Sequence, residues 1–187
     1  SEIKQYLPEK IENPSIDDMK ALFQKYDHIY VKPANGSLGL GVHQIIKRES
    51  EPYYYCRFRH NGTNRLRRYR SLKQLIDQLL TEKRLKTMVA QQGINLMKVE
   101  GRPLDFRIHA NKDIKGKWQV SAIAAKISGP NSVTTHLKSG GSVRSVAEIS
   151  KLRDEEPFHR SLSQLTEVSL RISHILDERT AGFLGEI

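Results

Sequence analysis

A lysine at the end of an apolar strand, followed by a glycine-rich loop, is the clearest candidate for chemistry in this chain. Residues 30–42 read YVKPANGSLGLGV, so Lys32 precedes Gly36, Gly39 and Gly41. Glycines let the main chain turn sharply and approach a ligand closely, and successive N–H groups in such a loop form a concavity for anions. A lysine adds a point charge suited to phosphate. The pattern predicts a nucleotide-phosphate cradle, although the lysine precedes the glycines, unlike in the Walker motif. The alternative is an ordinary β-hairpin with a flexible connection.

Two further groups of polar residues lie at strand positions. Gln91 and Gln92 end an apolar run, just before Gly93. Asp105 and Arg107 are two residues apart, which places them on the same face of a strand. On their own, the glutamines are more often a plain strand end, and the Asp105/Arg107 pair has an alternative role in a cross-strand salt bridge.

Metal and thiol chemistry are not favoured. The seven histidines never approach the i, i+4 spacing of a helical two-histidine metal site. Cys56 lies in a strand-like run without an obvious base beside it. As the single cysteine it excludes an internal disulfide, so a reducing, intracellular setting is expected.

Composition favours an anionic partner. The 187 residues suit one or two domains, and 31 lysines and arginines against 21 acidic residues give a net charge of +10. No apolar run approaches the length of a membrane span, and the N-terminus lacks the apolar core of a signal peptide.

The basic segment 57–86 leaves a nucleic-acid partner open. It carries ten lysines and arginines against two acidic residues, and aromatic residues lie within and just before it. Such a pattern is typical of single-strand binding. A solvated basic face that attracts ATP or an acidic substrate is the favoured interpretation.

The elements that must position these residues follow from periodicity. Strands are predicted at 28–31 and 42–46, on either side of the glycine loop. A hairpin is predicted at 53–59 and 65–69, with Asn61-Gly62 in its loop. A short helix begins at Ile16, capped by Ser15 or Asp17. A second helix follows Ser71, with apolar positions at helical spacing through residue 80. The first 16 residues show little periodicity and are interpreted as a connecting segment.

The second half of the chain forms another region. Strands are predicted at 87–92, 106–110 and 118–126, the last two separated by a turn at 113–117. A polar loop at 128–141 precedes a long amphipathic helix with apolar positions from 162 to 176. Residues 185–187 are predicted as the beginning of a strand. The predicted domains are therefore 1–16, 17–86 and 87–187.

The order of these features resembles the ATP-grasp superfamily of ADP-forming carboxylate–amine ligases. The closer likeness is to its YheC/YheD group of spore-coat-associated proteins from spore-forming bacteria. The matching strings are residues 30–33 with 36–39, then 91–94, 101–107 and 140–141. The resemblance implies an α+β fold of the ATP-grasp type. A small α+β lid subdomain (17–86) and a partial antiparallel sheet with helices (87–187) would hold ATP between them.

The resemblance also implies roles for residues. Lys32 would neutralise the α- and β-phosphates, and the glycine loop would close over the β- and γ-phosphates. The strand end at 91–94 would be the adenine hinge, and Asp105 would reach the ribose hydroxyls. The nucleotide-binding residues implied are Lys32, Gly36, Ser37, Leu38, Gly39, Gly41, Gln91, Gln92, Ile94 and Asp105.

The implied catalytic residues are Arg107, which would meet phosphate or the acyl-phosphate intermediate, and Lys126. Related ligases often carry an arginine at the position of Lys126, and lysine keeps the charge but loses the planar fork. His136 stands where they often have asparagine, in the loop before Gly140 and Gly141. These last three residues are implied to contact the substrates, an unidentified carboxylate and amine.

The family holds Mg²⁺ with an acid after the long helix and a following Glu-x-Asn pair. Ile187 lies about where the first of these would begin, so we expect metal ligands beyond it and assign none here. We therefore expect a core truncated at its C-terminus, with weakened nucleotide binding and no ligation. The alternative is a non-catalytic structural or interaction protein of the spore coat. A cytoplasmic or spore-coat location is expected, without a membrane span.

Overall fold

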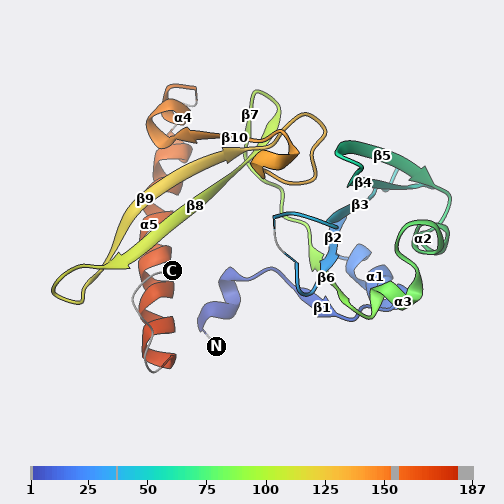
Figure 1. Ribbon diagram of the computed structural model, residues 1–187, viewed down its shortest axis with the longest axis horizontal. Helices are drawn as coiled ribbons and strands as arrows, with labels where there is room; N and C mark the ends of the chain where they lie inside the picture. The colour runs from blue at the N-terminus through green and yellow to red at the C-terminus, as the bar shows by residue number, and fades with distance from the viewer. Residues whose placement is uncertain (1, 37, 153–155, 181–187) are drawn as a thin grey trace. The chain divides into compact units, whose positions relative to one another are not determined.

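The computed structural model describes residues 2–36, 38–152 and 156–180, which form two compact units (Figure 1). The six-stranded unit comprises residues 7–96 and 128–142. The four-stranded unit comprises residues 1–6, 97–127 and 143–187. These units differ in extent from the predicted domains, because the loop 128–142 belongs with the first sheet rather than with the second.

The six-stranded unit is built on an antiparallel sheet in the order β1-β6-β2-β3-β4-β5. Its strands are β1 (Lys10–Glu12), β2 (His28–Pro33), β3 (His43–Lys47), β4 (Tyr54–His60), β5 (Thr63–Tyr69) and β6 (Met88–Gln92). The strands predicted around the glycine loop and at 87–92 are thereby confirmed.

One face of this sheet packs on helices. Ile29 and Val31 of β2 are fully buried in a core that also contains Met19 and Leu22 of α1 (Ile16–Phe23). A capping box starts α1: the Ser15 hydroxyl accepts from the Asp18 N–H, and the Asp18 carboxylate accepts from the Ser15 N–H. Ser15 is therefore the cap. Because side chains alternate along a strand, the residues between Ile29 and Val31 face the opposite side of the sheet.

The β4–β5 hairpin turns through Asn61 and Gly62. Their φ angles are +47° and +74°, and His60 pairs with Thr63 across the two-residue loop. Positive φ at both central positions is the requirement of a type I′ turn, which explains the Asn-Gly pair. The predicted hairpin is confirmed.

Two local predictions are corrected. The helix expected after Ser71 is capped by Ser71 and extends through residue 80, but its second half is not α-helical: α2 (Leu72–Leu75) passes into a π-helical turn, η2 (Ile76–Leu80). Thr81, at φ +56°, ends that turn, and its hydroxyl caps α3 (Glu82–Leu85). The first 16 residues are also more than a connection, since they include the 3-10 helix η1 (Glu2–Tyr6) and the edge strand β1.

The four-stranded unit has the sheet order β10-β9-β8-β7 and two helices. Its elements are β7 (Lys98–Val99), β8 (Arg102–Lys112), β9 (Trp118–Ile127), β10 (Ser142–Ser145), α4 (Val146–Leu152) and α5 (Glu156–Arg179). Leu104, Ala125 and Ile127 pack with Ile149 and Phe158 of the helices. Figure 1 shows α5 crossing the β8–β9 pair, and the helix contacts both strands. The two predicted strands and the long helix are confirmed, while the strand predicted at 185–187 lies outside the described residues.

None of the helices in the described ranges is long and apolar enough to cross a membrane.

Candidate functional site

Lys32 and Gln91, 59 residues apart in sequence, are joined by a hydrogen bond. The Lys32 Nζ donates to Gln91 Oε1 over 2.6 Å, and both residues are half-buried. The bond forms because β2 and β6 are neighbours, with Tyr30 opposite Gln91 and Lys32 opposite Val89. No ion pair of Lys32 occurs within the described residues. Its ammonium has three N–H donors, so two remain for an anion.

The side chains around Lys32 make the helix-free face of the sheet polar. Strand register aligns Gln91, Tyr30, Gln44 and Arg57 in one row across four strands. Gln44 Nε2 donates to the Tyr30 hydroxyl over 3.2 Å, and Arg57 Nη1 donates to Gln44 Oε1 over 3.3 Å. Burial raises the pKa of Tyr30 while the charge of Arg57 opposes this shift, so the phenol stays neutral at pH 7.

Tyr30 and Gln44 were missed by the sequence analysis, which considered Arg57 only as part of the basic segment 57–86. The available signal in the sequence was alternation, since Gln44 and Arg57 adjoin the buried apolar residues Ile45 and Cys56. That alternation shows which face a residue occupies, but it does not show which strands are neighbours.

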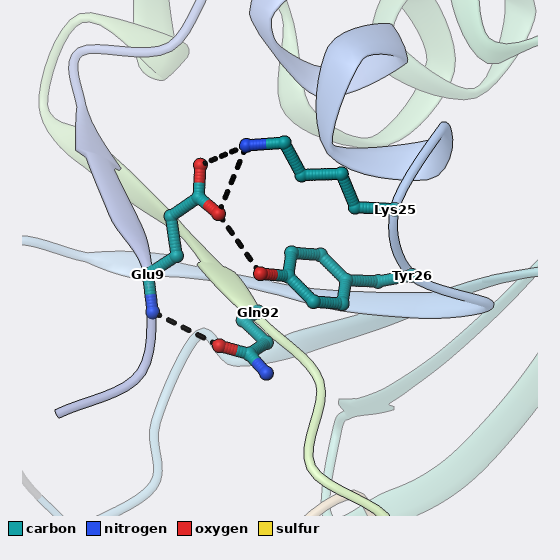
Figure 2. A network of polar contacts seen from close by, with 4 residues as sticks. All are labelled: Glu9, Lys25, Tyr26 and Gln92. Atoms are coloured by element: carbon teal, nitrogen blue, oxygen red, sulfur yellow. Dashed lines mark hydrogen bonds and ion pairs between the residues drawn. The ribbon is translucent and has the colours of Figure 1, made fainter. Parts of the chain in front are cut away.

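Gln92 points to the opposite face from Gln91 and belongs to a different network, shown in Figure 2. Its Oε1 accepts from the Glu9 N–H over 3.1 Å, and its own N–H donates to the Glu9 carbonyl over 2.8 Å. The Glu9 carboxylate accepts from Lys25 Nζ at 2.9 and 3.2 Å and from the Tyr26 hydroxyl at 2.8 Å. The Lys25 hydrogen bond, followed by that of Tyr26, lowers the pKa of Glu9. The main-chain N–H of Gln92, a residue of the implied adenine hinge, is thus already bonded within the protein.

Gly93 follows this strand end and packs tightly on β2. A Cβ at Gly93 would lie 2.2 Å from the His28 ring and 2.5 Å from its carbonyl oxygen. Its N–H donates to that carbonyl over 3.0 Å. The glycine therefore has a structural role beside the predicted hinge, and Ile94 next to it is exposed.

The glycine loop between β2 and β3 needs its glycines for two reasons. Gly39 and Gly41 both have φ +70°, where other residues are strained. Added Cβ atoms would lie 3.1 Å from the Thr134 side chain at Gly39, and 3.0 Å from Pro33 Cγ at Gly41. Leu38 is exposed at φ +60°, and Ser37 lies outside the described residues.

The second loop, 128–142, carries the three residues implied to contact substrate. His136 begins the 3-10 helix η3 (Leu137–Ser139), and its Nδ1 accepts from the Lys138 N–H over 3.2 Å. Gly140 has φ +83°, and a Cβ at Gly141 would lie 2.4 Å from the Thr135 carbonyl oxygen. Both glycines are therefore explained by the path of the loop, whatever else they contact.

Asp105, Arg107 and Lys126 lie in the four-stranded unit. Asp105 pairs with Lys126 across β8 and β9, and Arg107 is on the same face, opposite Ala124. This face is turned away from the core side chains Leu104 and Ala125. The predicted shared face of Asp105 and Arg107 is confirmed. Arg107 is exposed, and its Nε donates to His109 Nε2 over 3.3 Å, which adds a histidine that sequence reasoning missed.

The aromatic residues of the basic segment already contact cations of their own unit. Arg68 lies 4.5 Å from the centre of the Tyr53 ring, and Arg48 lies 5.3 Å from that of Tyr55. Lys47 and Arg67 are similarly placed over Tyr54 and Phe58. Ring faces covered in this way are not open platforms for stacking bases, so the geometry does not strengthen the nucleic-acid alternative.

The His, Cys, Asp and Glu side chains form no group of metal ligands across residues 2–36, 38–152 and 156–180. No group of three or more His, Cys, Asp or Glu residues gathers there. No residue of the described ranges is assigned to Mg²⁺, and no chemical step is assigned to a metal below.

Comparisons with known proteins connect these geometries to a family. A family model described as YheC/D-like ATP-grasp matches residues 1–187. The endospore coat-associated protein YheD of Bacillus subtilis (strain 168) is 35% identical over 189 residues. The alignment covers 97% of this chain but 40% of that relative, so the chain spans about two fifths of the relative's length. No solved structure matches.

Proposed function

Because this chain belongs to the YheC/D-like ATP-grasp family, we propose that it is the ATP-binding core of a carboxylate–amine ligase. In this proposal the six-stranded unit is the lid. Lys32 and the glycine loop 36–41 hold the ATP phosphates, and the strand end 91–94 receives the adenine.

The hydrogen bond between Lys32 and Gln91 is the observation that carries the proposal. It brings the predicted phosphate ligand and the predicted hinge onto one polar face, without a carboxylate neutralising the lysine within the described residues. A half-buried cation of this kind gains most from an anionic ligand. The glycine loop begins four residues after Lys32, just beyond the end of the same strand.

The proposed reaction has two steps. A carboxylate oxygen of one substrate attacks the γ-phosphorus of ATP, and the bond to the bridging oxygen breaks to release ADP. An amine then attacks the carbonyl carbon of the acyl phosphate, loses a proton and expels phosphate, which leaves an amide. Positive side chains favour both steps because they stabilise charge on the moving phosphoryl group.

The remaining assignments also belong to the proposal. Asp105 would accept from the ribose hydroxyls, while Arg107 and Lys126 would contact the transferred phosphoryl group. The loop containing His136, Gly140 and Gly141 would contact the carboxylate or amine substrate. The fit to ATP rests on the vacant Lys32 donors.

Substitution of Lys32 tests the cradle. Lys32→Ala should lower ATP affinity at least about tenfold, because a hydrogen bond to a charged group contributes roughly 1.5–3 kcal/mol. Affinity is measured by titration calorimetry with ATP and a non-hydrolysable analogue. Lys83→Ala is the matched control, since Lys83 is an exposed lysine of the same unit. Wild-type affinity in Lys32→Ala would show that the lysine does not bind phosphate.

A second candidate is a structural protein of the spore coat that keeps the fold without catalysis. The name of the YheD relative as endospore coat-associated favours this possibility. A spore-coat location is proposed on the same ground. ADP release from ATP, measured with pools of carboxylates and amines, separates the candidates. Binding to isolated coat material that is unaffected by ATP, together with no ADP release, would favour the structural role.

A further inference from the structure

Arg57 lies on the polar face of the six-stranded sheet with most of its donors unused. Its neighbours Cys56 and Phe58 are buried in the core, so alternation directs Arg57 to the other face, which it shares with Tyr30 and Gln44. Among the described residues its guanidinium makes no ion pair and one hydrogen bond, from Nη1 to Gln44 Oε1 at 3.3 Å. Its Nε is buried without a partner.

The geometry of that single bond leaves one edge of the guanidinium vacant. Nη1 is held by Gln44, whose amide nitrogen is in turn held by the Tyr30 hydroxyl. The free donors therefore include Nε–H and the adjacent Nη2. Together they form the planar fork that binds a carboxylate or phosphate through two parallel hydrogen bonds. A buried donor without a partner is costly, and an oxyanion on this edge removes the cost.

Strand β5, next to Arg57 in the sheet, is bonded to the loop 128–142, which is implied to contact substrate. Asn64 of β5 is a diagonal neighbour of Arg57 on the same face, at a spacing of about 7–8 Å. Asn64 Nδ2 donates to the Pro130 carbonyl at 3.1 Å and to that of Ser139 at 3.5 Å. Its Oδ1 is also buried without a partner. The β4–β5 hairpin thus holds the loop 128–142 near the free donors of the Arg57 guanidinium.

We propose that Arg57 is an oxyanion-binding residue of this face, with Gln44 and Tyr30 as the residues that orient it. The oxyanion is either a phosphate of the nucleotide or the carboxylate of the acceptor substrate. This inference rests on the proposed function for the identity of the ligand. It adds a cation from the β4–β5 hairpin to the one that Lys32 supplies.

The test observes the Arg57 Nε–H group directly by NMR of arginine side chains, with its signal assigned by its loss in Arg57→Lys. A phosphate partner predicts a shift of this signal on addition of ATP or ADP but not adenosine, and at least about a tenfold loss of ATP affinity in Arg57→Gln. A carboxylate partner predicts a shift with acetate or glutamate and an unchanged affinity for ATP.

Controls separate the possible failures. Arg65→Gln alters an exposed arginine on the opposite face of the same hairpin, across from Phe58, and should leave the Arg57 signal and ATP affinity unchanged. No shift with any of these anions, together with wild-type ATP affinity in Arg57→Gln, would overturn the inference even if ATP binds. Absence of ATP binding in the wild type, with an acetate-induced shift, would instead refute the proposed function alone.

Discussion

At the scale of single residues, the six-stranded unit contains two reactive side-chain types in opposite environments. Lys32 is half-buried on the polar face and bonded only to a neutral amide among the described residues. Cys56 lies on the opposite face of the same sheet and is fully buried in the apolar core. Burial raises the pKa of its thiol to about 12, because the thiolate would lose its hydration. Cys56 therefore acts as a small core residue, in agreement with the low expectation of thiol chemistry from the sequence.

Alkylation of Cys56 checks this assignment. At pH 8 the native protein should react with iodoacetamide at least about a hundredfold more slowly than the denatured protein, because the thiolate is the reactive form. The rate is followed by mass spectrometry, and protein in denaturant supplies the reference. Rapid labelling of the native protein would contradict the burial of Cys56.

At the scale of elements, the sequence predicted the helix caps and turns that depend on a few adjacent residues. The capping box at Ser15 and the Asn61-Gly62 turn each need only a few adjacent residues. The edge strand β1 was missed because a three-residue strand with one inward side chain, Ile11, has no periodicity to detect. The short helix α3 was missed, because Thr81, which separates it from η2, has a positive φ that is rare for a β-branched residue.

For the candidate site, single residues were predictable from the sequence, but the contacts between them were not. Lys32 and the glycines stand out in the sequence, and the family resemblance supplied Gln91. The contact between Lys32 and Gln91, and the row containing Arg57, depend on which strands pair across tens of residues. Period-two alternation gives the face of each strand but not the order of strands in the sheet.

Glu9 bonds Gln92, Lys25 and Tyr26 beside the edge strand β1. Its contribution to the free energy of unfolding should depend on pH. Its folded-state pKa lies below the ordinary 4.5 because Lys25 and then Tyr26 donate to the carboxylate. Stabilisation by ionised Glu9 is therefore complete above about pH 4.5 and is lost as the pH falls through the lower folded value. Urea unfolding of Glu9→Gln and wild type should differ at pH 7, and the difference should shrink below pH 4.5.

Glu49→Gln is the control for Glu9→Gln, because Glu49 is exposed on the same unit. A difference between Glu9→Gln and wild type that stays constant from pH 7 to pH 3 would show that the ionised carboxylate is not what stabilises the edge.

At the scale of the whole molecule, each unit contains a unique internal reporter. The single cysteine lies in the six-stranded unit and the single tryptophan, Trp118, in the four-stranded unit. Trp118 Nε1 donates to Asp177 Oδ2 over 3.3 Å, and Lys112 Nζ donates to Asp177 Oδ1 over 2.6 Å. Asp177 therefore ties α5 to both strands of the β8–β9 pair.

Asp177→Ala should lower the denaturant midpoint seen by Trp118 fluorescence more than the midpoint seen by Cys56 labelling. The reason is that the lost contacts all lie in the four-stranded unit. Glu178→Ala, at the exposed neighbouring position, should leave both midpoints unchanged. Equal shifts of the two midpoints in Asp177→Ala would show that the units unfold together.

The chain passes from one unit to the other between residues 6 and 7, 96 and 97, 127 and 128, and 142 and 143. Neither unit is a contiguous stretch, so neither can be excised or exchanged between proteins as a single segment. A protease cut between residues 96 and 97 would leave each resulting fragment with part of both units. The fragments would then have to stay associated, as in a complementation pair, for either unit to remain complete.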